Sequence, residues 1–526
     1  MMKRLSRSTI SLALLTLLCL EPLPCCAVEA LPLSASNRPV EGKVNLKNPP
    51  LEASDLAFPI NLATALRLSD ARPLIVAGAQ AAAWVSEARL QRAQVLWVPS
   101  FNIGADYYRH EGLGPDLKGG VNNPASPLFQ NVSFLYAGGG LTQAVAMTDA
   151  IFQPLAARQV LNSRRWNIQT AKNDAVLAAA QAYFSVQQYR GMYAGALDAV
   201  ARGRKLVERV ASLSRDLVPR VEVNRALRLL ADLEQQAALA RQQWRVASAN
   251  LTQVLRLDPR VVVVPAEPDY LQITLIDPSR PLYELIPIAL TNRPELASQQ
   301  ATVKAVAERI RREKGRILLP SIFLTGWQTP NQLLQFGFQG IGPHNNVLDN
   351  TSFRDDVSPQ VVWQFEALGL GNLARIKEQR GEQSLAIVDL FRIQDAVAAE
   401  VTRAQARLQS AALRVLQAQR SAHEAVLTYD GNYEGLAETT RFHNFLIEVY
   451  RPQEADIALQ HLLNSYDEYF TTVADYNRAQ FELFHALGYA AQELTNLRPP
   501  GALRPVNTTR PPPLPPVSAG PPPADR

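Results

Sequence analysis

The chain has 526 residues, of which 19% are charged and 47% are hydrophobic, so it exceeds one ordinary compact domain and is not disordered throughout. A net charge of +5 is too small to indicate nucleic-acid binding. The three cysteines, Cys19, Cys25 and Cys26, all lie near the N-terminus, which excludes a disulfide scaffold, a cysteine zinc site and a cysteine nucleophile elsewhere in the chain.

Residues 1–30 have the layout of a secretory signal peptide. A basic start is followed by an apolar run, Thr9 to Leu20, and then by small residues suited to a cleavage site. The apolar run is short for a membrane anchor, and an uncleaved anchor stays open as an alternative. Lipidation at Cys26 or Cys25 is a second alternative. Residues 31–57 then read as a flexible lead-in.

Two stretches of the sequence, 71–101 and 292–322, share the same pattern of proline residues. Each opens with an Arg-Pro pair and closes with a Pro-Ser pair, at the same spacing in both. A repeat of this size indicates duplication of a whole structural unit rather than a short-period solenoid. We therefore predict a first repeat over 58–260, a linker over 261–281 and a second repeat over 282–490.

Each repeat is predicted to contain a helix, a pair of strands and a long helical stretch, in that order. Residues 74–97 lack proline, are rich in helix formers and are bounded by prolines, which predicts a helix. The stretches 155–258 and 375–487 each hold one proline, Pro219 and Pro452, so each reads as two long helices joined near it. Helices of this length favour a coiled-coil-like arrangement, although composition alone leaves an ordinary helical bundle open.

Residues 99–107 and 360–367 alternate between apolar side chains and mostly polar or small ones, which predicts strands with one apolar face. The apolar positions with the largest side chains are Phe101, Ile103, Tyr107, Val361, Trp363 and Phe365. Weaker strands are predicted over 132–143 and 320–328. Such strands fit either a transmembrane barrel or a small soluble sheet that packs one face on a core.

Each predicted strand pair is split by a long loop rich in Gly, Asn and Pro, at 109–131 and at 330–356. Long loops at one end are typical of a membrane barrel. Four strands cannot close a barrel, and open edges are not tolerated in lipid. The membrane alternative therefore requires several chains to share one barrel, and three chains would supply 12 strands. The predicted helices are also too long for one compact core, so they too indicate that several chains pack together.

Taken in order, the signal peptide, the duplication, the strand pairs and the helical hairpins make the sequence resemble the TolC family of outer-membrane efflux channels. The resemblance covers about 58–490 and includes AQAYFSVQ (180–187), VVWQFEALGLGNLARIKEQR (361–380) and TVADYNRAQFELFHALG (472–488). It implies a mainly α chain with a small β part. Two tandem repeats with long coiled-coil-like helical hairpins would form an α-barrel, and four strands per chain would join a shared 12-stranded trimeric β-barrel.

The resemblance also implies partners and a location. The channel would be a homotrimer in outer-membrane lipid that extends into the periplasm. It would dock to a periplasmic adaptor (a membrane fusion protein) and an inner-membrane pump, and would export solutes from a tripartite efflux or type I secretion assembly. The expected adaptor contacts at the two helical tips are Leu217, Val218, Pro219, Glu222, Val223, Tyr450 and Pro452.

Glu454 and Asp456 lie near where some family members carry an acidic ring at the closed tunnel end. Three copies would gather six carboxylates, which favours cation binding and raises some of their pKa values. Alternatively, these acids cap the N-terminus of the following helix. The first tip departs from the family pattern, with Asp216 in place of glycine and Glu222 in place of aspartate, and the second lacks the usual glycine. These departures leave open which adaptor docks.

No catalytic or metal-binding pattern occurs in the sequence. The six histidines lack ligand spacing, and there is no phosphate loop, nucleophile elbow or HExxH motif. We therefore predict no enzyme activity, no cofactor, no metal and no nucleic-acid partner, but a passive duct that draws its energy from the pump. The alternative is a soluble periplasmic coiled-coil scaffold or adaptor. The final segment, 491–526, is Pro-rich and is predicted to be a disordered tail.

Overall fold

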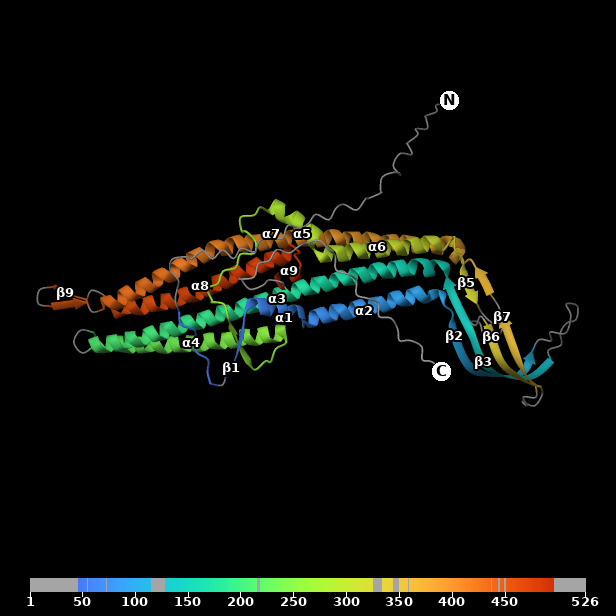
Figure 1. Cartoon of the computed structure of the whole chain (residues 1–526), viewed down its shortest axis with the longest axis horizontal. Helices are drawn as coiled ribbons and strands as arrows, with labels where there is room; N and C mark the ends of the chain where they lie inside the picture. Colours follow the sequence, from blue (N-terminus) through green and yellow to red (C-terminus); the bar gives the residue numbers. More distant parts are fainter. Residues whose placement is uncertain are drawn as a thin grey trace, which may run out of the picture.

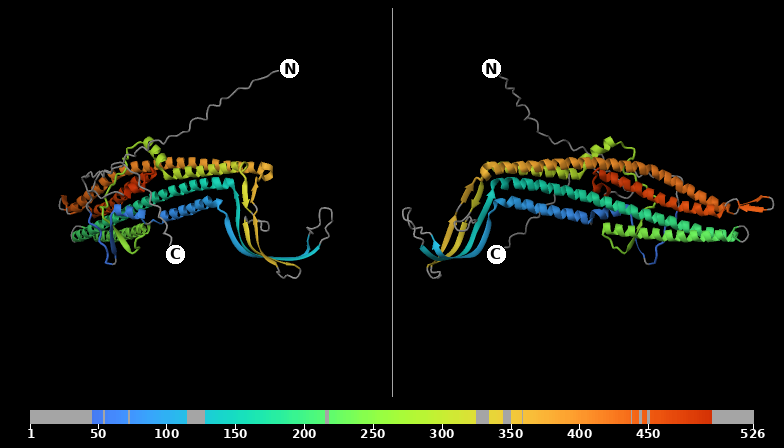
Figure 2. Two further views of the ribbon diagram at one scale, coloured as in Figure 1. Left: turned by 45° about the vertical axis from the view of Figure 1, so that its right-hand side comes forward. Right: turned by 180° about the vertical axis from the view of Figure 1, so that it is seen from behind.

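The computed structural model describes residues 46–495 except 54, 72, 115–127, 215–217, 325–333, 344–349, 358, 437, 443–444 and 449–450. Long helices run along the molecule (Figure 1). A curved sheet lies at one end, and a hairpin of strands β9 (Thr439–Phe442) and β10 (Phe445–Glu448) lies at the other (Figure 2). The predicted fold class, mainly helical with a small β part, is confirmed.

The long helices pack side by side in one row (Figure 1). One edge of the row is formed by α2 (Leu74–Gln94), which continues into the short η1 (Val95–Trp97), and by α4 (Arg220–Leu255). Both α2 and α4 pack against α3 (Met147–Leu213), and α3 packs against α6 (Pro294–Gly315) and α8 (Pro452–Ala486). The other edge is formed by α7 (Leu370–Gly435), which packs against α6 and α8. The corresponding helices of the two halves are nearly equal in length, at 67 and 66 residues for α3 and α7 and 36 and 35 residues for α4 and α8. Within the described ranges, none of the helices combines the length and the apolar content needed to cross a bilayer.

Small residues of α3 let α8 approach closely. A Cβ atom at Gly191 would lie 2.7 Å from Cγ of Phe470, and one at Gly195 would lie 2.9 Å from Cβ of Tyr466. Both aromatic side chains are buried, at 4% and 1% exposure. The seam between α3 and α8 therefore depends on the absence of side chains at two α3 positions that lie one turn apart.

The sheet consists of six strand segments: β2 (Ser100–Gly114), β3 (Leu128–Ala146), β5 (Ser321–Leu324), β6 (Leu334–Pro343), β7 (Asn350–Val357) and β8 (Pro359–Val362). β3 pairs antiparallel with β2 on one side and with both β5 and β6 on the other. β8 pairs with β5, and β7 pairs with β6. β5 and β6 lie one after the other along β3 and together occupy one strand position, here called a strand line, and β8 and β7 together occupy the next. The sheet therefore has four strand lines, in the order β2, β3, β5 with β6, and β8 with β7, which matches the order of the helices α2, α3, α6 and α7.

Several expected boundaries in this region are wrong. The strand expected over 360–367 ends at Val362, so Trp363 and Phe365 lie beyond it, in the turn that leads through η2 (Glu366–Gly369) into α7. The loop expected over 330–356 contains β6 and β7, and the loop expected over 109–131 is shortened at both ends by β2 and β3. Pairing with neighbouring strands fixes these Gly-rich segments, whereas their local composition resembles a loop.

A group of short elements, here called the belt, lies around the middle of the helical row (Figure 1). It consists of β1 (Leu56–Ile60), α1 (Leu62–Ala71), β4 (Val261–Pro265), α5 (Leu282–Asn292) and α9 (Ala491–Thr495). β1 and β4 pair in parallel, so a strand begins within the last two residues of the expected lead-in, and another strand lies in the expected linker. The expectation of an unstructured tail from 491 is wrong for its first five residues, which form α9 with Leu494 buried. Pairing between distant segments leaves no local periodic signal.

Candidate functional site

Both helical tips lie at the end of the row opposite the sheet (Figure 1). α3 ends at Leu213 and α4 begins at Arg220, while α7 ends at Gly435 and α8 begins at Pro452. The β9–β10 hairpin stands between α7 and α8 and projects beyond the helices. The sequence predicts a direct joint near Pro452, because strands of four residues are too short to produce a recognisable alternation.

The expected contact residues at the tips have different surroundings. Two of them, Leu217 and Tyr450, lie outside the described residues. Val218 and Pro452 are buried within the chain, and Val223 is half-buried against the core. Pro219 is exposed and directly precedes α4. Of the described apolar residues in this set, Pro219 is therefore the one most accessible to a partner.

The two expected gate acids also differ. Glu454 lies in the first turn of α8 and is exposed, whereas Asp456 lies further along the helix and is half-buried. No side chain caps the start of α8 through a hydrogen bond. The position of Glu454 in the first turn still favours its negative charge through the helix dipole. Asp456 lies beyond that turn, so the capping alternative does not explain its place.

Asp456 faces Glu222 of the other hairpin. The Glu222 carboxylate accepts a hydrogen bond from Gln453 at 3.4 Å and pairs with Arg225 at 2.6 Å. One oxygen of each carboxyl group, Oε2 of Glu222 and Oδ1 of Asp456, is buried with no hydrogen-bond partner among the described residues. Burial and then the charge of Glu222 raise the pKa of Asp456 to about 6, while Arg225 opposes the rise. The two hairpins thus meet at a pair of carboxyl groups that repel each other when both are ionised.

Solved structures show what this architecture resembles. A membrane protein from Pseudomonas aeruginosa superposes with a TM-score of 0.63 at 16% identity, over 86% of this chain and 97% of that chain. The CmeC outer membrane channel of Campylobacter jejuni gives 0.62 at 13% identity, over 81% and 85% of the two chains. The MtrE outer membrane channel of Neisseria gonorrhoeae gives 0.58 at 15% identity, over 85% and 96%. The chain has the fold of TolC-type outer-membrane efflux channels. No family model matches the sequence, and neither does any curated protein.

Within this channel fold, Arg202 joins three helices in the half of the row that carries the tips. Its guanidinium group pairs with Asp198 of α3 at 2.7 Å and with Asp430 of α7 at 2.5 Å. The hydroxyl group of Tyr466 on α8 donates to Asp198 at 3.1 Å. The guanidinium group also lies 5.2 Å from the ring centroid of Tyr429. This cluster could not be predicted from the sequence, because its members lie on helices far apart in the chain.

The expected membrane-facing residues lie at the sheet end of the channel fold. Phe101, Ile103 and Tyr107 are 56%, 80% and 54% exposed and share one face of β2, because alternate residues of a strand point to the same side. Val361 is exposed on β8. Trp363 and Phe365 are exposed beyond the end of β8, as described above. Within the described ranges, no group of three potential metal-ligating residues occurs.

The pair formed by Asp456 and Glu222 predicts a pH-dependent effect. The pKa of Asp456 is raised above its unfolded value, so its contribution to stability is full below about pH 4 and is lost as the pH rises through about 6. Asp456→Asn, which imitates the protonated carboxyl group, should raise the thermal unfolding midpoint less near pH 5, where part of the contribution is lost, than near pH 8, where all of it is lost. The measurement is the difference in midpoint between variant and parent at both pH values.

Glu454→Gln is the matched control for this prediction. It neutralises an exposed carboxylate on the same helix, two residues away, and should lower the midpoint slightly at both pH values, because the favourable interaction with the helix dipole is lost, rather than raise it near pH 8. An Asp456→Asn variant whose midpoint shifts equally near pH 5 and near pH 8 would contradict the assignment of the repulsion to this pair.

Proposed function

We propose that three copies of this chain form an outer-membrane channel that extends into the periplasm and exports solutes. It acts as a passive duct in a tripartite efflux or type I secretion assembly, docked to a periplasmic adaptor and driven by an inner-membrane pump. The observation that carries the proposal is the pair of open edges on the single chain. Among the described strands, β2 pairs with β3 alone, and β7 and β8 are unpaired on their outer side.

The helical row ends on the same two sides as the sheet, with α2 and α4 at one edge and α7 at the other. A contact between unlike edges repeats from copy to copy, and the copies close into a ring when the successive rotations add up to one full turn. Open strand edges are not tolerated in lipid, so a sheet of this kind in a membrane has to close. Three copies of four strand lines give 12 strands, within the range of known membrane barrels.

Apolar side chains on the two edges support the ring. Trp84 on α2 is 67% exposed, and Leu385 and Phe391 on α7 are 68% and 58% exposed. Extended apolar surface of this kind is rarely left bare on a soluble monomer, and neighbouring copies would cover it. The exposed face of β2 suits lipid contact. No observation favours the alternative of a soluble scaffold.

The tips would then form the periplasmic end of the duct. We assign adaptor contacts to the tip residues around Pro219 and Pro452, and a gate to Glu454 and Asp456. The meeting of Asp456 with Glu222 across the two hairpins supports the gate, because separating the hairpins would relieve the repulsion between them. Their negative charges would also favour cations at the narrow end.

The experiment begins with fractionation of cells that express the full chain. The mature protein should be found in the outer membrane, run as a trimer in mild detergent and conduct ions in planar bilayers. A soluble periplasmic monomer would overturn the proposal. The variant Glu454→Ala/Asp456→Ala should raise the leak conductance or change the cation selectivity. A conducting trimer that this variant leaves unchanged in both respects would remove the gate and leave the duct.

A further inference from the structure

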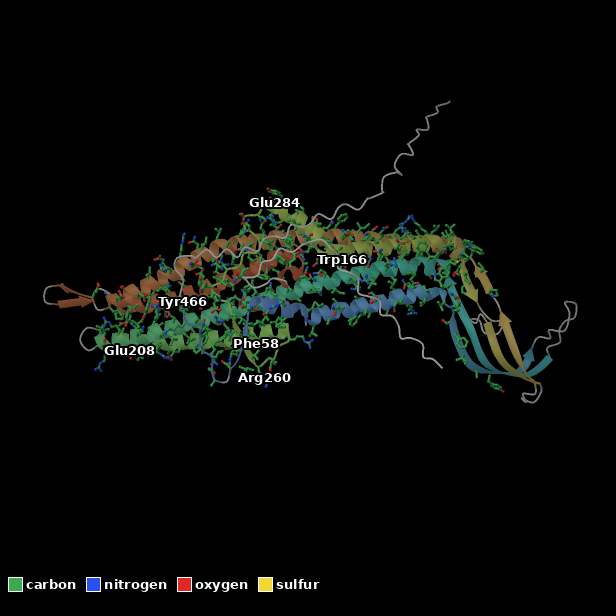
Figure 3. All side chains as sticks on the ribbon, viewed as in Figure 1. Phe58, Trp166, Glu208, Arg260, Glu284 and Tyr466 are labelled. Carbon is green, nitrogen blue, oxygen red and sulfur yellow. The ribbon has the colours of Figure 1, made fainter. Side chains whose placement is uncertain are left out.

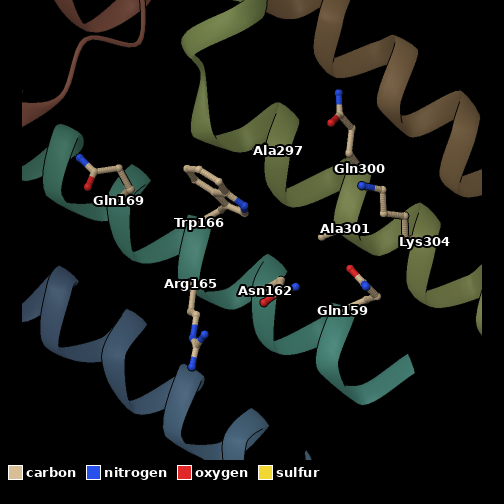
Figure 4. A pocket seen from close by; sticks show the side chains of 9 residues that line it. All are labelled: Gln159, Asn162, Arg165, Trp166, Gln169, Ala297, Gln300, Ala301 and Lys304. Carbon is tan, nitrogen blue, oxygen red and sulfur yellow. The ribbon is translucent and has the colours of Figure 1, made fainter. Parts of the chain in front are cut away.

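A groove of about 640 Å³ lies between α3 and α6 (Figure 4), on the part of the helical row between the belt and the sheet, where Figure 3 labels Trp166. Its most prominent side chain is Trp166 of α3, which is 46% exposed and whose position along the row is labelled in Figure 3. The polar side chains that line it include Gln159, Asn162, Arg165, Gln169, Gln300 and Lys304. The described lining residues include no carboxylate.

Gln169 and Trp166 lie about one turn apart on α3, on the side where the belt helix α9 packs. Gln169, which lines the groove, donates a hydrogen bond to Gln492 of the belt helix α9 at 3.1 Å. α3 and α6 are inner members of the row, so copies that join at the edges α2, α4 and α7 leave the groove uncovered. If the belt faced the lumen of the channel, it would obstruct the lumen. The side of the row that carries the belt and the groove is therefore the outside of the duct. This step rests on the proposed function.

The side chains in the groove are those that recognise a sugar with acidic substituents. An indole ring offers an apolar face and an N–H donor, which suits the C–H face and the hydroxyl groups of a pyranose ring. The amide side chains both donate and accept hydrogen bonds, as hydroxyl and acetamido groups do. Lys304 of α6 forms no ion pair with any residue that the structure describes, so its ammonium group is available to a carboxylate, whereas the side chain of Arg165 extends from α3 toward α2 (Figure 4).

We propose that this groove binds a glycan strand that carries acetamido and carboxylate groups, the chemistry of the bacterial cell-wall polymer. Its volume lies in the range of ligand sites, roughly 300–1,000 Å³. Trp166 lies 19 residues into α3, or about 28 Å from the sheet end of that helix. In the proposed channel this depth is periplasmic, just below the membrane, where the cell wall surrounds the shaft.

Two other occupants fit less well. A neutral glycan would leave the ammonium group of Lys304 without a partner. A Pro-rich segment, such as residues 499–526 of this chain, usually docks between several aromatic rings, whereas the groove offers one. The segment also carries arginines, which Lys304 would repel. The test below separates both from the acidic glycan.

The test measures binding of glycan fragments to the full chain in detergent. The probes are uncrosslinked fragments released from peptidoglycan by a muramidase, which carry carboxylates, and chitotetraose, which is neutral. Trp166→Ala should weaken binding of the acidic fragments by about tenfold or more, because the stacked ring is lost. Lys304→Gln should weaken binding of the acidic fragments and leave binding of chitotetraose unchanged. Arg164→Gln, an exposed arginine on α3 outside the groove, should change neither.

Three results would overturn the proposal. The first is a wild-type chain that binds neither probe, and the second is a Trp166→Ala variant that binds as well as the wild type. The third is competition by a peptide of residues 499–526, which would assign the groove to the tail. The oligomeric state is measured on the same samples. A monomer whose glycan binding still depends on Trp166 would refute the duct while leaving the glycan site in place.

Discussion

Replacing Gly191 by leucine is expected to prevent the two halves of the chain from packing together. Gly191 lies on α3 directly against the buried ring of Phe470 on α8, where even a methyl group would overlap the ring. Extra carbon atoms in a packed interior typically cost about 1–3 kcal/mol, and a leucine side chain adds four. We expect the thermal unfolding midpoint to fall sharply, or the chain to fail to fold, as followed by circular dichroism in detergent.

Two further variants make this result specific. Gly381→Leu places the same side chain on α7 at a site with nothing within 4 Å, and it should leave the midpoint nearly unchanged. Phe470→Ala removes the ring that Gly191 accommodates, so Gly191→Ala should destabilise the wild type more than it destabilises the Phe470→Ala background. A Gly191→Leu chain that melts at the parent temperature would show that α3 and α8 do not meet as described.

The long helices could be predicted because their signals are local. Pro219 directly precedes the second helix of its hairpin and Pro452 begins the second helix of the other, and the alanine-rich stretches before them contain few residues that break a helix. β2 was also predictable, because Phe101, Ile103 and Tyr107 alternate along it. The β1–β4 pair and the β9–β10 hairpin were missed because short strands are fixed by their partners rather than by their own composition.

The candidate site shows the same limit. Glu454 and Asp456 look equivalent in sequence, yet two residues on a helix point about 200° apart, so one is exposed and the other turns inward. Glu222 was expected to contact a partner, and the structure places it against Asp456. That meeting depends on how the two hairpins lie side by side, which no pattern within either hairpin specifies.

A buried ion pair fixes the belt to α3. Arg190 of α3 donates to Asp269 at 3.0 Å and to the backbone carbonyl group of Pro265 at 2.6 Å. The side chains of Arg190 and Asp269 are only 7% and 11% exposed. One turn to two turns earlier, Gln187 donates to the carbonyl group of Pro268, and Tyr183 donates to Glu267. One face of α3 thus holds the segment that follows β4.

Burial raises the pKa of Asp269 to about 6, although Arg190 lowers it in part. The folded pKa lies above the unfolded value, so the contribution of Asp269 to stability is full below about pH 4 and is lost as the pH rises through about 6. Near neutral pH the carboxylate is ionised in a poorly solvated site, and Arg190 is the charge that compensates it.

Arg190→Met is therefore expected to destabilise the chain strongly, and more so at higher pH. Removing one partner of a buried pair costs about 3–5 kcal/mol, because the other charge stays buried without compensation. The loss in free energy of unfolding, measured by denaturant titration, should be largest near pH 8 and smaller near pH 5, where Asp269 gains a proton. Adding Asp269→Asn to this variant should recover part of the loss and remove its pH dependence.

Arg204→Met is the control that separates a buried pair from a surface pair. Arg204 lies on the same helix and pairs with Glu234 at 2.9 Å, but the two side chains are 64% and 49% exposed. Exposed pairs contribute about 0–1 kcal/mol, because water already solvates both charges. Two results would mean that Asp269 does not depend on Arg190. The first is that Arg190→Met lowers the free energy of unfolding no more than Arg204→Met does. The second is that Arg190→Met lowers it equally near pH 5 and near pH 8. The belt would then be held to α3 by its apolar contacts and by the hydrogen bonds of Tyr183 and Gln187.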